Sequence, residues 1–113
     1  MGRKTKKQLK LEALEKDLMV LINTESAIEL EKVARYVNLV SIFDDLDKSI
    51  KEKGAMVLTV NGSQEFYKAN PAISEKVKVN AALIKLDSFF DKKREEYETK
   101  KAKSNDIDMD DFV

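Results

Sequence analysis

A change of hydrophobic period near the middle of the chain restricts the folds open to it. Charged segments with helical spacing flank residues 54–72, whereas residues 56–60 are apolar with the alternation of a β-strand. Asn61-Gly62 follows directly and is typical of a type I′ turn, in which both central residues need a positive φ. We therefore expect a β-hairpin at about 55–68 between two long helices.

The predicted turn also sets the pairing of the two strands. A two-residue loop at Asn61-Gly62 would place Val60 opposite Ser63 and bring four apolar side chains onto one face of the hairpin: Met56, Leu58, Val60 and Tyr67. An isolated two-stranded hairpin is only marginally stable in water. A neighbouring subunit would cover this face if the hairpin is an assembly element. The alternative is an ordinary connector between two helices.

Capping signals divide the rest of the chain into three helices. Thr5 with Gln8, and Ser26 with Glu29, have the spacing of capping boxes. They predict helices over about 5–22 and 26–53. Gly54 suits the end of the second helix. Asn70-Pro71 suits the start of a third that runs to about residue 100, with Asn70 as N-cap and Pro71 at the first helical position.

The second helix has an apolar face wider than one partner helix needs. Its two stripes are Leu30, Val33, Val37 and Val40, and Tyr36, Leu39, Phe43, Leu46 and Ile50. The helix would be about 40 Å long, whereas a compact domain of this size has a radius of gyration of roughly 13 Å. We expect an elongated antiparallel helical hairpin in a homo-oligomer larger than a dimer, with Val37, Val40, Phe43 and the hairpin face as oligomerisation residues.

The charges balance overall but are segregated at the two ends. Lys and Arg together number 21, as do Asp and Glu. The head carries Arg3, Lys4, Lys6, Lys7 and Lys10, and the tail carries Asp106, Asp108, Asp110 and Asp111. We interpret residues 1–103 as one helical domain and residues 104–113 as a flexible acidic tail. The head could bind an anionic partner or be only a solvated helix end, and the tail could order on a partner or be only a disordered terminus.

The residue types needed for most catalytic and metal sites are missing from the sequence. There is no histidine and no cysteine, and none of the three glycines belongs to a phosphate-binding loop. Asp44 and Asp47 share a helix face and could hold a divalent cation, but a solvated helix face explains them better. No apolar run is long enough to cross a membrane. We expect a soluble intracellular protein that is not an enzyme and has no cofactor or metal.

The central pattern resembles that of the small-subunit family of tailed-phage terminases. The resemblance rests on Gly54, Val57, Thr59, Asn61-Gly62 and Asn70-Pro71-Ala72, with flanking helices, and it covers about residues 28–90. It implies a mainly α, ring-forming, non-catalytic protein in the host cytoplasm. Such subunits bind viral double-stranded DNA at the packaging-initiation sequence and regulate the terminase large subunit, which carries the ATPase and nuclease.

The resemblance suggests roles for the basic head and the acidic tail. We assign DNA binding to Arg3, Lys4, Lys6, Lys7 and Lys10, and large-subunit binding to Asp108, Met109, Asp110, Asp111 and Phe112. The alternative function is a helical oligomerisation module or adaptor that binds no nucleic acid. Salt-sensitive binding to duplex DNA would distinguish the two.

Overall fold

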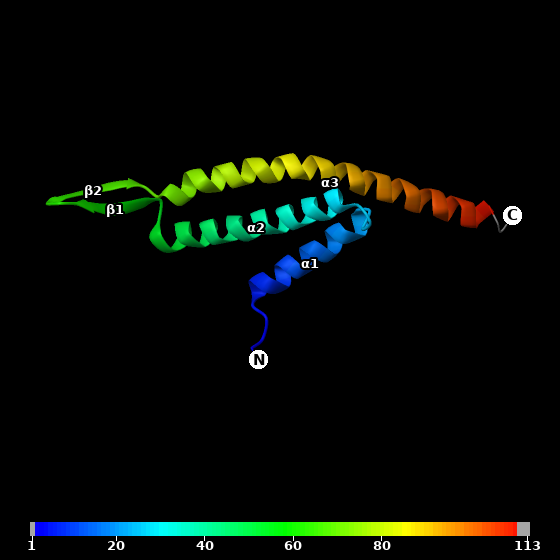
Figure 1. The fold of residues 1–113 in the computed structure, drawn as a ribbon, viewed down its shortest axis with the longest axis horizontal. Helices are drawn as coiled ribbons and strands as arrows, with labels where there is room; N and C mark the ends of the chain where they lie inside the picture. Colours follow the sequence, from blue (N-terminus) through cyan, green and yellow to red (C-terminus); the bar gives the residue numbers. More distant parts are fainter. Residues whose placement is uncertain (1, 111–113) are drawn as a thin grey trace.

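The described residues of the protein form three helices and one β-hairpin in a computed structural model (Figure 1). The backbone is described for residues 2–110 and the side chains for residues 2–104. The elements in chain order are α1 (Lys6–Leu21), α2 (Ala27–Lys53), β1 (Met56–Asn61), β2 (Gln64–Ala69) and α3 (Pro71–Asp110). The predicted mainly α fold with a central β-hairpin is confirmed. The ring-like assembly stays a prediction.

The two predicted capping boxes differ in the structure. Thr5 caps α1 with a complete box, because its side chain accepts from the Gln8 N–H and Gln8 accepts in return from the Thr5 N–H. Ser26 accepts from the Glu29 N–H at the start of α2. The Glu29 carboxylate, however, accepts from the Asn23 N–H and pairs with Lys93 at 2.9 Å. A cationic partner on α3 has replaced the reciprocal bond, so the second box is only half formed.

The β-hairpin has a different turn and register from those predicted. Gly62 has a φ of +66°, and among the described residues no residue other than glycine has a positive φ. These values match a type II′ turn with Gly62-Ser63 at its centre, which needs a positive φ only at the first position. Asn61 therefore belongs to β1 and pairs with Gln64, so the predicted type I′ turn is wrong.

The register is correspondingly shifted by two residues. Met56 pairs with Ala69 and Leu58 with Tyr67, where the sequence predicted Met56 opposite Tyr67. Because side chains alternate with a period of two, a shift of two leaves each on its original face. The predicted apolar face of Met56, Leu58, Val60 and Tyr67 is therefore retained.

Asn70 fastens the hairpin to the helices at its base. Its side chain accepts from the Ala72 N–H at 3.0 Å, which confirms the predicted N-cap of α3. The side-chain amide also donates to the Gly54 carbonyl, and its backbone N–H donates to the Ala55 carbonyl. Gly54 ends α2 with a φ of +83°. One buried side chain thus joins the end of α2 to the start of α3.

The core lies at the end of the α2–α3 pair that is far from the hairpin (Figure 1). Leu18 and Ile22 of α1 pack there with Val33 of α2 and Phe90 of α3, and Leu14, Met19, Leu21, Tyr36, Val37, Leu86 and Phe89 surround them. The molecule measures 84 × 37 × 26 Å with a radius of gyration of 21.0 Å. This confirms the predicted elongated helical hairpin.

The third helix is longer than predicted. Its backbone remains helical to Asp110, past the expected end near residue 100. Residues 92–103 contain no glycine or proline and consist mainly of strong helix formers. The change in composition at residue 104 therefore does not mark the end of the helix, and the backbone of the first part of the acidic tail belongs to α3.

Candidate nucleic-acid interface

The predicted DNA-binding residues lie together at the N-terminal end of α1. Arg3 and Lys4 precede the Thr5 cap, and Lys6, Lys7 and Lys10 occupy the first turns. All five are exposed except Lys7, which is partly covered. Cations at a helix N-terminus oppose the helix dipole, so helix stability does not explain their presence. We call these five residues the basic head.

Most of the basic head is paired with carboxylates in the structure. The Lys4 ammonium contacts Glu12 at 2.8 Å, and Lys10 contacts Asp44 of α2 at 3.0 Å. Lys7 contacts Asp45, the next residue of α2. Arg3 and Lys6 make no ion pair within the described residues. The basic head is therefore exposed but partly neutralised, and its partners on α2 lie too far along the sequence for local spacing to reveal them.

The aspartates weighed as a metal site serve as ion-pair partners instead. Asp47 accepts from Lys76 of α3 at 2.7 Å and from Lys51 at 3.1 Å. The hydrogen bond from Lys76, and then that from Lys51, lower the pKa of Asp47. Within the described part of the chain, no group of three or more acidic, His or Cys side chains is arranged to hold a metal ion.

The outer face of α3 carries a second set of cations that the sequence analysis missed. Lys78, Lys85 and Lys92 recur every seven residues, and each is exposed. Seven residues are almost two helical turns, so these lysines lie along one side of the helix. Small exposed residues lie beside them: Ser74, Ala81 and Ser88. The seven-residue spacing is the signal that could have revealed this lysine row.

The predicted oligomerisation residues fall into two groups. Val37 packs against the core within the chain, and Val40 and Phe43 are partly buried. The Lys76 ammonium lies over the Phe43 ring at 4.9 Å from its centre. Met56, Leu58, Val60 and Tyr67 instead each expose more than half of their surface. The hairpin face is thus the part of the predicted set that the described residues leave exposed.

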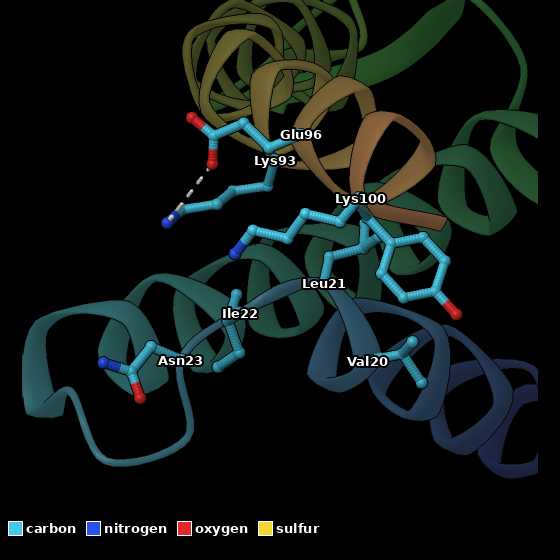
Figure 2. Close-up of a pocket in the computed structure, with 8 residues that line it drawn as sticks. Val20, Leu21, Ile22, Asn23, Lys93, Glu96 and Lys100 are labelled. Atoms are coloured by element: carbon cyan, nitrogen blue, oxygen red, sulfur yellow. Dashed lines mark ion pairs between the residues drawn. The ribbon is translucent and has the colours of Figure 1, made fainter. Parts of the chain in front are cut away.

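A small hollow lies where the α1–α2 turn meets α3 (Figure 2). Its volume is about 220 Å³, and it is lined by Val20, Leu21, Ile22, Asn23, Lys93, Glu96, Tyr97 and Lys100. Lys93 is already bound to Glu29, and this hydrogen bond raises the pKa of Lys93 and lowers that of Glu29. These contacts hold the α1–α2 turn against α3, so we interpret the hollow as part of the helix packing and not as a binding site.

The predicted partner-binding tail lies at the limit of the structure. Asp108, Met109 and Asp110 belong to the last turn of the α3 backbone, and their side chains are not among those described. Asp111 and Phe112 lie outside the described residues. Their assignment remains a prediction.

The fold and these surfaces define an elongated helical protein whose exposed faces are charged or apolar and suit contacts with other macromolecules. No helix in the described part of the chain combines the length and apolarity that crossing a membrane requires. The model of a protein family described as "Phage terminase, small subunit" matches residues 17–91, which is more than half of the chain. The chain therefore belongs to the phage terminase small-subunit family, whose members act in phage DNA packaging and are generally non-catalytic. Neither the curated proteins nor the solved structures gave a match.

Proposed function

We propose that this protein recognises viral double-stranded DNA and regulates the terminase large subunit during genome packaging in the host cytoplasm. The family match over residues 17–91 is the observation that carries the proposal. The basic head precedes the matched segment, so its role is supported by charge and exposure alone. Lysine and arginine side chains at an exposed helix end can contact successive phosphates, which position a protein on DNA without reading its sequence.

DNA binding through the basic head has a quantitative signature. Each phosphate neutralised on duplex DNA contributes about −0.9 to the slope of log affinity against log salt. Removing residues 1–7 deletes Arg3, Lys4, Lys6 and Lys7 from each subunit and should flatten that slope. A matched control replaces Lys48, Lys51, Lys53 and Lys68, which lie near the hairpin, with glutamine. Binding should be measured by fluorescence anisotropy over a range of salt concentrations.

Two outcomes would redirect the proposal. If wild-type protein shows no salt-sensitive binding to duplex DNA, the adaptor function without nucleic acid becomes the better account; the exposed hairpin face favours that alternative. If binding is salt-sensitive but the deletion leaves it unchanged, the lysine row of Lys78, Lys85 and Lys92 on α3 becomes the candidate surface.

Self-association is the second part of the proposed function. The apolar face of the hairpin, and Val77 and Ile84 of α3, are left exposed by the part of the chain that the structure describes. Exposed apolar patches of this kind mark surfaces that bind protein partners. We infer a ring-like homo-oligomer larger than a dimer, in which several basic heads act on one DNA duplex.

The acidic C-terminal residues are proposed to bind the large subunit. Met109 and Phe112 would serve as apolar anchors, with Asp108, Asp110 and Asp111 steering the encounter electrostatically. A pull-down of the large subunit by full-length protein and by a variant lacking residues 104–113 tests this. Full binding by the truncated variant would refute the assignment and leave the DNA proposal standing.

A further inference from the structure

The α2 carboxylates that contact the basic head bind lysine ammonium groups that would otherwise be available to DNA phosphates. The Lys10 ammonium lies 3.1 and 3.0 Å from the two carboxylate oxygens of Asp44. Lys7 donates to the neighbouring Asp45. Asp44 and Asp45 therefore present adjacent negative charges to two lysines of the proposed DNA site, as a pair of phosphates would.

These contacts act on the less firmly packed half of α1. The buried residues of the helix, Leu18 and the adjoining Ile22, lie at its C-terminal end, whereas Leu9 near the N-terminus is 53% exposed. In Figure 1 the axis of α1 diverges from that of α2 toward the N-terminus. Exposed ion pairs contribute little to stability. Phosphates could therefore replace these aspartates without disrupting the core.

We propose that Asp44 and Asp45 compete with DNA phosphates for Lys7 and Lys10 and thereby set the DNA affinity of the basic head. This inference rests on the proposed function. A lysine that already faces a carboxylate neutralises a phosphate less effectively, because the carboxylate repels the incoming anion. Binding then exchanges each aspartate for a phosphate, and the two aspartates hold non-specific DNA affinity below what the five cations would give alone.

Neutralising the two aspartates tests the competition directly. The probe is a labelled DNA duplex of mixed sequence, because the phosphate contribution does not depend on sequence. The Asp44→Asn/Asp45→Asn variant should bind about two- to tenfold more tightly than wild type, given the weakness of exposed pairs. Its salt slope should steepen by up to about 1.8 per chain, the contribution of two further phosphates.

The control must release two cations elsewhere with the same change in net charge. Glu31 pairs with Arg35, and Glu52 pairs with Lys48, both on α2. Glu31→Gln/Glu52→Gln therefore matches the test variant in charge and in ion pairs lost. Because charges beyond about 10 Å are screened at 0.1 M salt, this control should change affinity less. An equal gain in both variants would overturn the inference.

A double-mutant cycle tests whether the gain acts through the named lysines. Adding Lys7→Gln/Lys10→Gln to the Asp44→Asn/Asp45→Asn variant should abolish the gain in affinity. A gain that persists without these lysines would refute the competition, even if wild-type binding is salt-sensitive. If wild-type protein shows no salt-sensitive DNA binding, the proposed function itself is refuted, so the two failures are distinguishable.

Discussion

The side chain of Tyr36 links α2 to α3 through both its ring and its hydroxyl. Its ring meets the Phe90 ring edge to face, with centres 5.3 Å apart, and its hydroxyl donates to Asp87 at 2.8 Å. Burial, followed by the hydrogen bond to Asp87 and the charge of that carboxylate, raises the pKa of Tyr36 to about 12. The structure therefore favours the neutral phenol.

Replacing Tyr36 with phenylalanine should lower the free energy of unfolding by about 1 kcal/mol, since one hydrogen bond is lost and the ring packing is kept. The raised pKa adds a pH signature. The stability that it provides is present below the ordinary pKa of 10.0 and is lost as pH rises through about 12. Between these values wild type should lose more stability than Tyr36→Phe. Denaturant unfolding at several pH values measures the difference, with Tyr97→Phe as the control at an exposed tyrosine.

At the scale of elements, the β-hairpin depends on one backbone conformation, and none of the described residues covers its apolar face. Both strands project beyond the ends of α2 and α3 (Figure 1), and every residue of β2 is exposed. A Cβ atom added at Gly62 would meet nothing within 4 Å. Any effect of substitution there must come from the positive φ of the backbone and not from a steric clash with neighbouring atoms.

Gly62→Val should therefore disorder the hairpin turn, at a cost of about 1–2 kcal/mol or more. Far-UV circular dichroism should retain most of its helical signal, because α2 and α3 pack through their own apolar residues. Self-association should weaken if the hairpin face is an assembly surface. Ser63→Val places the same side chain at a position without positive φ and serves as the control. A disordered hairpin with unchanged assembly would show that the hairpin is only a connector.

The whole molecule is long in relation to its core. The buried residues of the core cluster, Leu18, Ile22, Val33 and Phe90, gather where all three helices meet, while most of the α2–α3 pair and the hairpin extend away from them. Such an arrangement concentrates stability at one end. It leaves the remaining apolar surface available for contacts with other subunits.

Phe90→Ala should consequently affect the entire fold. Phe90 is 3% exposed and contacts the rings of Tyr36 and Phe89. Truncating a buried phenylalanine costs about 3–5 kcal/mol, which is comparable to the total stability of a small domain, about 5–15 kcal/mol. Denaturant unfolding should show a large loss of stability. The exposed Lys85→Ala on the same helix should stay within about 0.5 kcal/mol of wild type.

The assembly prediction also belongs to this scale. Purified protein should have a mass larger than that of a dimer in light scattering across micromolar concentrations, because the hairpin face and the apolar side chains of Val77 and Ile84 on α3 are exposed. Protein that stays monomeric throughout that range would contradict the predicted oligomer.

We further expect the purified chain to hydrolyse neither ATP nor DNA, and magnesium-dependent nicking that is lost in Asp44→Ala would contradict this.

Features that depend on local chemistry could be predicted from the sequence. Thr5 and Asn70 cap helices because their side chains reach backbone N–H groups two or three residues away. Gly54 ends α2, and the alternation in residues 56–60 identifies the strand and its apolar face. The elongated shape followed from helix length, and the family resemblance followed from the same central residues.

Contacts between groups far apart in the sequence could be seen only in the folded chain. Glu29 pairs with Lys93 of α3 and does not complete the expected capping box. Asp44 and Asp45 pair with Lys10 and Lys7 of α1, because the fold brings these helices within contact distance. The predicted hairpin register was wrong by two residues. Both registers keep the same apolar face, so the hydrophobic pattern could not distinguish them. Ion pairing and register depend on three-dimensional position, which local spacing does not specify.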